Sequence, residues 1–153
     1  MPPPTATCDT LISKLKEFEG LSLVAYKPTK AERWYTIGYG HSTGGVRAGI
    51  RITEEKAEER LKRDLFFVEK FVNSIPKVKT QGQFDALVSF TYNAGIGNLK
   101  KSTLLKKIMH DASAAVIQRE FMKWVHSGGK KLGRLVKRRS WEAQRWGSVV
   151  ACE

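Results

Sequence analysis

Residues 19–41 constrain the fold more than any other stretch of this chain of 153 residues. Glu19-Gly20 follows an amphipathic helical segment, and the chain then runs through Ala25-Tyr26-Lys27-Pro28 to Trp34-Tyr35-Thr36-Ile37-Gly38-Tyr39-Gly40-His41. Short apolar stretches broken by a proline and glycines predict a small β-hairpin. A helix that ends on a glutamate beside such a hairpin can hold one carboxylic acid over a groove.

The first half of the chain predicts two helices on either side of this hairpin. A helix over 9–19 is indicated by apolar residues on one face, with Asp9 as its cap and Gly20 at its end. Residues 21–52 predict a small antiparallel sheet with loops. A second helix, capped by Thr53, continues to just before Pro76, and its twenty-odd residues make it about 30 Å long.

The second half predicts only helices, turns and loops. A helix over 81–93 precedes a Gly95-Ile96-Gly97 turn, and Ser102 and Asp111 are the expected caps of two further helices. Residues 127–133 predict a loop of glycines and lysines, and the last helix carries Leu135, Val136, Trp141 and Trp146. The tryptophans are expected in the core.

The expected fold class is α+β, with a small antiparallel β lobe and a helical lobe. We expect one domain over 1–153, with the β lobe at about 20–52 and a linking helix at about 53–74. The helical lobe covers about 76–147 together with the helix 9–19. A cleft is expected between the two lobes.

The net charge of +12 predicts an anionic partner, such as nucleic acid, an anionic membrane or an acidic cell-wall polymer. A charged surface that serves only solubility is the alternative. No apolar run approaches the ~20 residues of a transmembrane helix. The first residues, Met1-Pro2-Pro3-Pro4-Thr5, have neither the basic nor the apolar region of a secretory signal. Synthesis in the cytoplasm is therefore expected. A monomer is expected as well.

Cys8 and Cys152 are the only two cysteines. Two free surface thiols are the first expectation, and no metal-binding spacing is present. The alternative is a bridge between the termini, worth up to ~4–5 kcal/mol in the entropic model and formed only in an oxidising compartment. No metal and no cofactor are expected.

Glu19 lies one turn after Leu15 and directly after Phe18. Apolar surroundings disfavour the charged form of a carboxyl, and a protonated carboxyl is what donates a proton to a glycosidic oxygen. A solvated glutamate at the end of a helix is the plain alternative.

Glu19-Gly20, Ala25-Tyr26 and Thr36-Ile37-Gly38-Tyr39-Gly40-His41 resemble the tailed-phage lysozymes, or endolysins, of glycoside hydrolase family 24. Phe90-Thr91-Tyr92-Asn93-Ala94-Gly95 resembles the cleft segment of that family's second lobe. Ser102-Thr103-Leu104-Leu105 and Gly133-Arg134-Leu135-Val136-Lys137-Arg138-Arg139 resemble its later helices. The resemblance covers about residues 10–147 in order.

The resemblance implies cleavage of the β-1,4 bond between N-acetylmuramic acid and N-acetylglucosamine in peptidoglycan, and hence bacterial lysis. It implies that Glu19 is the general acid and that Thr36 lies near the attacking water or the glycosyl intermediate. His41 matches a supporting histidine, whose expected partner is Asp64. Two further residues match positions that face the sugar, with core packing and a helix C-cap as their respective alternatives: Tyr92 and Asn93.

The chain departs from the family pattern at the second carboxylate. The family usually carries an aspartate, sometimes a cysteine, nine residues after the glutamate, and Pro28 occupies that position here. Counting back from the threonine gives Lys30 instead. The hairpin is two residues longer than usual, and Glu32 is the only acid inside it. Glu32 is thus a candidate second carboxylate, with a solvated turn residue as the alternative.

Three activities remain open on this reading. Glu19 can act with a water positioned by Thr36 and assisted by Glu32. The 6-hydroxyl of muramic acid can attack instead, as in lytic transglycosylases, which need a single acid/base. The third reading is a catalytically weak or inactive module that only binds glycan.

Basic residues and tryptophans alternate from Lys123 to Trp146, with Glu142 the only acid among them. No helix-turn-helix, RNP or zinc signature accompanies them, so nucleic acid is not the expected partner. We expect release to the cell wall through a holin, and electrostatic contact with the anionic envelope through six residues: Lys130, Lys131, Arg134, Lys137, Arg138 and Arg139.

Overall fold

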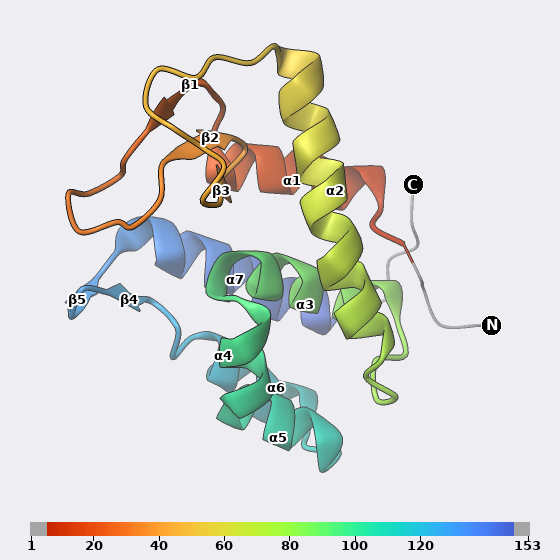
Figure 1. The fold of residues 1–153 in the computed structure, drawn as a ribbon. Coiled ribbons are helices and arrows are strands. Elements are labelled where there is room, and N and C mark those ends of the chain that lie inside the picture. The colour runs from red at the N-terminus through yellow and green to blue at the C-terminus, as the bar shows by residue number, and fades with distance from the viewer. Residues whose placement is uncertain (1–5, 149–153) are drawn as a thin grey trace. The chain divides into compact units, whose positions relative to one another are not determined.

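The computed structural model describes residues 6–148. Its elements, in chain order (Figure 1), are α1 (Asp9–Glu19), β1 (Ser22–Tyr26), β2 (Thr36–Gly38), β3 (His41–Ser42), α2 (Glu54–Asn73), α3 (Gln81–Ala94), α4 (Ile96–Lys101), α5 (Thr103–Met109), α6 (Ala114–Phe121), β4 (His126–Ser127), β5 (Lys130–Lys131) and α7 (Gly133–Trp146). The α+β class expected from the sequence is confirmed.

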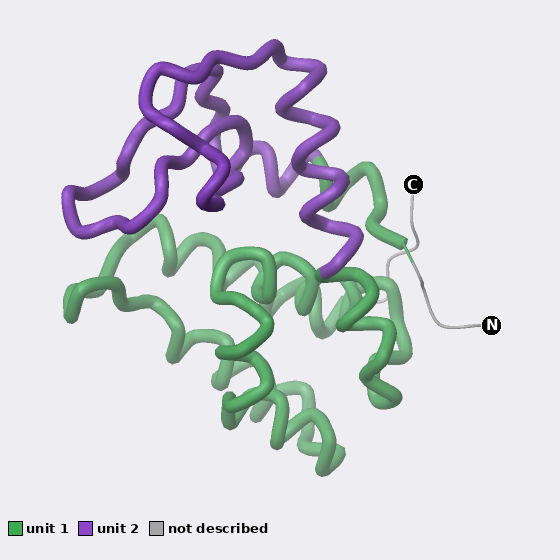
Figure 2. The backbone as a smooth tube through the Cα atoms, in the orientation of Figure 1, with its two compact units in different colours: residues 1–12, 68–153 green, residues 13–67 purple. Residues whose placement is uncertain are grey.

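The chain forms two compact units, shown in purple and green in Figure 2. Unit 2 is residues 13–67, and the described part of unit 1 is residues 6–12 and 68–148. Helices α1 and α2 each contribute residues to both units.

Unit 2 is built on a three-stranded antiparallel sheet in the order β1-β2-β3. Tyr26 pairs with Thr36 across β1 and β2, and Ile37 pairs with His41 across β2 and β3. One face of this sheet carries the small core of the unit, because alternate residues of a strand point to the same side. That core contains Ala25, Ile37 and Val46, with Tyr35, Ile50 and Ile52 packed against them.

Gly20 ends α1 and Thr53 precedes α2 as predicted, but the prediction that Asp9 caps α1 is wrong. Asp9 is the first residue of the helix, and the carbonyl of Cys8 before it accepts from the N–H of Ile12 at 3.0 Å. Gly20 closes α1 with φ 67°, and its N–H donates to the carbonyl of Lys16 at 2.9 Å. A left-handed conformation at this position favours glycine, which has no Cβ. The hydroxyl of Thr53 accepts from the N–H of Lys56 at 3.2 Å, so the predicted N-cap of α2 is confirmed.

Unit 1 is helical, and α3 packs against α7 in it. Thr80 and Gln83 form a capping box at the start of α3, which satisfies two backbone N–H groups that the helix cannot. The ring of Phe90, in α3, lies 5.8 Å from that of Phe121 and 5.3 Å from that of Trp124. Trp146 is buried as expected, whereas Trp124 and Trp141 are half-buried.

Three local predictions in unit 1 are wrong. The helix α4 begins at Ile96, directly within the predicted turn. Ser113, not Asp111, caps α6, because Asp111 has the left-handed φ of 57° and lies before the helix. The predicted loop over 127–133 is mostly a hairpin that begins one residue earlier, at His126, with β4 and β5 joined by Gly128 and Gly129 at φ 58° and 78°.

The expectation of free surface thiols is wrong for Cys8. Its side chain is 1% exposed, and it is disulfide-bonded. Cys152, the other cysteine, lies outside the described residues. Of the described helices, none is long and apolar enough to cross a membrane.

Candidate functional site

Glu19 is the last residue of α1, and its half-buried side chain lines an open pocket of about 330 Å³ in unit 2. The other lining residues come from the segment that follows the helix: Gly20, Leu21, Ser22 and Tyr26. The left-handed turn at Gly20 lets β1 leave the helix end without covering the carboxyl. One carboxylic acid is therefore presented at the wall of a solvent-accessible pocket.

The second glycine of the Thr36–His41 motif makes room for this carboxyl. Gly40 has φ 80°, and a Cβ at that position would lie 2.6 Å from Oε2 of Glu19. Any other residue would displace the Glu19 carboxyl and strain the turn between β2 and β3. Gly38, the first glycine, has φ 65° and packs against Ala57 of α2.

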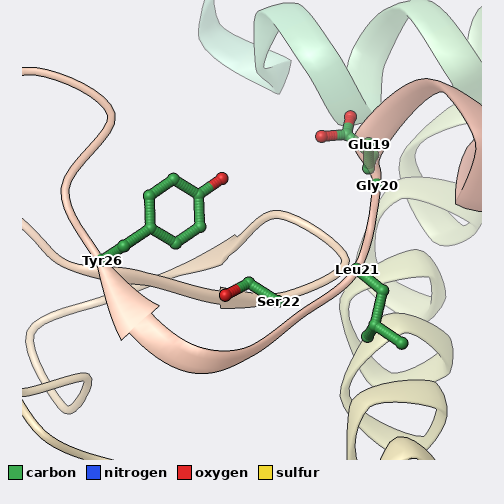
Figure 3. A pocket seen from close by; sticks show the side chains of 5 residues that line it. All are labelled: Glu19, Gly20, Leu21, Ser22 and Tyr26. Carbon is green, nitrogen blue, oxygen red and sulfur yellow. The ribbon is translucent and has the colours of Figure 1, made fainter.

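Tyr26 and Ser22 add hydroxyl groups to the pocket wall (Figure 3). The hydroxyl of Tyr26 points toward the end of the pocket where Glu19 lies, whereas the side chain of Leu21 turns away. The hydroxyl of Ser22 donates to the carbonyl of Val24 at 2.7 Å. The pocket thus combines a carboxyl, two hydroxyls and an aromatic ring, which suits a polyhydroxylated ligand.

Thr36 and Glu32, the two other predicted catalytic residues, differ in their position relative to the Glu19 pocket. Thr36 is 8% exposed and pairs with Tyr26, so the sheet fixes it beside the pocket wall. Glu32 is exposed in the loop between β1 and β2, where its N–H donates to the carbonyl of Thr29 at 3.2 Å. Among the described residues, neither is one of those that line the pocket.

His41 and Asp64 form the contact expected from the sequence. Nδ1 of His41 lies 2.6 Å from Oδ2 of Asp64, and the two side chains are 14% and 28% exposed. The contact joins β3 to α2 within unit 2. Since Ile37 of β2 pairs with His41, the same contact also restrains the strand that begins with Thr36.

A second ion pair joins α1 to α2 one turn before Glu19. Nζ of Lys16 donates to Oε1 of Glu58 at 2.8 Å and lies 5.5 Å from the ring centre of Tyr39. The hydrogen bond to Glu58 raises the pKa of Lys16 and lowers the pKa of Glu58. The helix that carries Glu19 is thereby held against α2.

Asn93 lies in the last turn of α3 and lines a separate pocket of about 310 Å³ in unit 1. The helix ends at Gly95, so Asn93 is not the C-cap that the alternative reading expected. Its Oδ1 accepts a hydrogen bond from Nη2 of Arg139. Tyr92, beside it, is half-buried rather than core. Residues that sequence reasoning did not select also line this pocket: Asn98, Trp124, His126 and Ser127.

Arg138 and Arg139 are buried, so their assignment to a basic surface is wrong. They are 4% and 2% exposed, and both contact Glu142, whose side chain is fully buried. Ser89 donates to the same carboxyl. Burial raises the pKa of Glu142, and the charges of Arg139 and Arg138 oppose that rise. A buried charge is tolerated when it is paired and hydrogen-bonded. Glu142, the only acid between Lys123 and Trp146, provides that pairing for Arg138 and Arg139.

Four of the six selected basic residues are exposed: Lys130, Lys131, Arg134 and Lys137. Arg134 also lines the Asn93 pocket. Within residues 6–148, no group of three His, Cys, Asp or Glu side chains is arranged to hold a metal ion.

Residues 16–142 match the sequence model of the family described as phage lysozyme. The chain belongs to the phage lysozyme family. The match covers both candidate regions, from α1 to α7.

An endolysin of Bacillus phage B103 is 47% identical over 135 residues, which are 86% of this chain and 50% of the phage protein. The chain spans about half the length of the first curated relatives it matches. The muramidase domain of SpmX from Asticaccaulis excentricus has a similar structure, with a TM-score of 0.82, 29% identity and coverage of 96% and 99% of the two chains.

A mutant of P22 lysozyme gives a TM-score of 0.76 at 33% identity and covers 95% of this chain and 100% of the other. These structures share the fold of this chain, as members of one family are expected to.

For this member of the phage lysozyme family, the sequence did not identify Ser22 and Tyr26 as pocket residues, nor the space that Gly40 leaves for Glu19. Tyr26 had a signal, since it lies in the Ala25-Tyr26 motif.

Proposed function

We propose that this chain is a muramidase that cleaves the β-1,4 bond between N-acetylmuramic acid and N-acetylglucosamine in peptidoglycan. The observation that carries this proposal is the Glu19 carboxyl, which lines an open pocket in a chain of the phage lysozyme family. The similar muramidase domain of SpmX supports the same reaction class. Peptidoglycan is thus the proposed substrate.

Glu19 acts in this proposal as the general acid that protonates the leaving glycosidic oxygen. Such protonation is needed because the bond breaks through a transition state with positive charge on the sugar ring. Gly40 leaves space for the carboxyl, and the hydroxyl of Tyr26 is available to the sugar. The contact between His41 and Asp64 acts indirectly, by fixing the hairpin.

The second reacting group distinguishes two mechanisms. In the first, Thr36 positions a water molecule and Glu32 assists its attack. In the second, the 6-hydroxyl of muramic acid attacks and leaves a 1,6-anhydro end. Hydrolysis is the proposed mechanism, and the attack by the 6-hydroxyl is the alternative. The alternative is supported by the exposed position of Glu32, since Glu19 is the only carboxylate among the described residues that line the pocket.

Digestion of purified, lipid-free sacculi followed by mass spectrometry tests the proposal. Muropeptides with reducing ends support hydrolysis, and 1,6-anhydro ends support the transglycosylase route. Sedimentation with sacculi without any new ends would instead identify a glycan-binding module. Full activity of Glu32→Gln would leave Glu19 as the only essential carboxylate in the hairpin region.

Tyr92 and Asn93 are proposed to contact the glycan from unit 1. The pocket at Asn93 offers an amide, an indole ring and the guanidinium of Arg134. The bond from Arg139 fixes Oδ1 of Asn93 and leaves Nδ2 for a ligand. Asn93→Ala is expected to weaken sedimentation with sacculi without altering the chemistry of the products.

The exposed cations Lys130, Lys131, Arg134 and Lys137 are proposed to hold the chain on the anionic envelope. Their contribution is electrostatic and is therefore screened by salt. Replacing Lys130 and Lys131 by Gln is expected to reduce both binding to sacculi and its dependence on salt. The proposed place of action is the bacterial cell wall, reached after release through a holin.

A further inference from the structure

Phe66 and Phe67 are the most exposed large apolar side chains among the described residues. They are 61% and 60% exposed, and both belong to α2. Their neighbours Leu65 and Val68 are buried, so the helix turns one apolar face inward and these two rings outward. The ring centres lie 5.6 Å apart in an edge-to-face arrangement. Single exposed apolar residues are common on proteins, but two adjacent phenyl rings form a patch.

Cations lie one turn before each ring. Lys62 precedes Phe66 by four residues and Arg63 precedes Phe67 by four, which places each cation next to a ring on the helix surface. Both cations are exposed. We call these four residues the Phe66–Phe67 patch.

The acids of α2 near this patch are engaged with other groups. Asp64 contacts His41, and Glu59 lies 3.7 Å from Lys56. Glu69 accepts from Thr7 at 2.7 Å. Glu58 accepts from Lys16, and Lys62 contributes less than Lys16 to the lowered pKa of Glu58. The Phe66–Phe67 patch therefore presents positive charge together with its rings, on a chain whose net charge is +12.

The combination of exposed rings and flanking cations selects one kind of partner. A free phosphate would satisfy the cations but would leave the rings in water, and the flat face of a sugar could stack on only one of two rings whose planes stand 80° apart. The surface of an anionic bilayer satisfies both, because acyl chains accept aromatic side chains and headgroup phosphates attract Lys and Arg. We propose that the Phe66–Phe67 patch binds the surface of an anionic lipid bilayer, with both rings among the acyl chains.

Sedimentation of the full chain with vesicles of pure phosphatidylglycerol tests this proposal. The chain is expected to bind these vesicles, and the double variant Phe66→Ser/Phe67→Ser is expected to bind at least about tenfold more weakly. The double variant Lys62→Gln/Arg63→Gln is expected to bind these vesicles about tenfold more weakly and to lose most of the parent's preference for phosphatidylglycerol over phosphatidylcholine. Met109→Ser, which removes a side chain 39% exposed on α5, serves as the matched control and is expected to bind as the parent does.

The depth of the rings is measured separately. A tryptophan introduced by Phe66→Trp is expected to be quenched by brominated phosphatidylglycerol more strongly than one introduced by Met109→Trp, each corrected for the signal of the parent chain. Digestion of lipid-free sacculi is expected to be unchanged in Phe66→Ser/Phe67→Ser, so membrane binding and peptidoglycan cleavage fail or succeed independently.

Three results would overturn the proposal. In the first, the parent chain does not bind phosphatidylglycerol vesicles. In the second, the Phe66→Ser/Phe67→Ser variant binds them as well as the parent does. Alternatively, sedimentation velocity without lipid reveals a dimer that the double variant abolishes, while vesicles bind neither protein. That last outcome identifies the patch as an interface between two copies of the chain.

Discussion

Glu19 in unit 2 and Glu142 in unit 1 are both helical glutamates beside aromatic and aliphatic residues, yet their surroundings differ. Glu142 is fully buried and is contacted by two guanidinium groups and a serine hydroxyl. Glu19 is half-buried, and a glycine and an open pocket lie next to its carboxyl. A carboxyl enclosed by cations holds a core together, whereas a carboxyl at a pocket wall is accessible to a substrate.

Glu19→Gln is expected to produce the largest change in activity. Removing the general acid should lower the cleavage rate of sacculi by about 10²–10⁴-fold, because glutamine cannot donate the proton. The free energy of unfolding should change little, since the replacement keeps the shape of the side chain. The release of reducing or anhydro ends measures the rate, and urea unfolding measures the stability.

Glu17→Gln is the matched control for this variant. Glu17 lies on the same helix, is exposed, and pairs only weakly with Lys14 at 3.3 Å. It should retain the parent rate. Retained activity of Glu19→Gln would show that the acid has been wrongly assigned.

Glu142→Gln is expected to act on stability instead. It leaves Arg138 and Arg139 buried without their anion, which should lower the free energy of unfolding by about 3–5 kcal/mol. Urea unfolding gives this value. Glu120→Gln is the control, because Glu120 is also buried but pairs with Lys123, whose side chain is 69% exposed and can be solvated. Equal losses in the two variants would contradict the role of the buried pair.

Gly40→Ala is expected to combine both effects on a smaller scale. A left-handed backbone costs alanine about 1–2 kcal/mol relative to glycine. The added Cβ also displaces the Glu19 carboxyl, and a misplaced reacting group can cost about 10²-fold in rate. Gly49→Ala separates the backbone strain from the displacement of Glu19, because Gly49 has φ 81° and its added Cβ has nothing within 4 Å. The two variants should lose similar stability, and only Gly40→Ala should lose activity.

Glu58→Gln is expected to have the smallest effect, visible in the pH dependence of stability. The pKa of Glu58 is lowered from 4.5, so the stability it contributes is present above that pH and is lost as the pH falls through the folded pKa. The pKa of Lys16 is raised from 10.5, so its contribution is lost as the pH rises through its folded pKa. When the free energy of unfolding is measured by urea at a series of pH values, Glu58→Gln should show a weaker dependence on pH than the parent at both the acidic and the alkaline end.

Glu59→Gln is the comparison for this pair. Glu59 lies 3.7 Å from Lys56, and both side chains are more than 60% exposed. Its replacement should leave both ends of the pH profile unchanged. Matching profiles for the two variants would mean that the Lys16–Glu58 pair does not stabilise the fold.

Much of the fold was predictable because local signals dominate it. The Thr53 and Ser102 caps follow from short-range hydrogen bonds that their side chains make, and the end of α1 follows from the left-handed backbone of Gly20. The hairpin of β4 and β5 was missed because its strands are two residues each and carry polar or charged side chains. Strands this short give no alternation to detect.

The candidate site was predictable in its residues but not in its packing. The motif identified Glu19 and His41, and the expected contact with Asp64 is present. It could not show that Gly40 approaches Glu19, since that depends on how the hairpin meets the helix end. Nor could it show that Arg138 and Arg139 point inward, because a run of basic residues on a helix is usually exposed.

The division of the chain into units has a consequence for the order in which it is made. Residues 6–12 belong to unit 1, and Thr7 donates to Glu69 at 2.7 Å while the carbonyl of Ala6 accepts from Gln81 at 3.4 Å. Domains form as their residues leave the ribosome. Residues 6–12 therefore cannot form their contacts with Glu69 and Gln81 until all of unit 2 and the start of α3 have been synthesised.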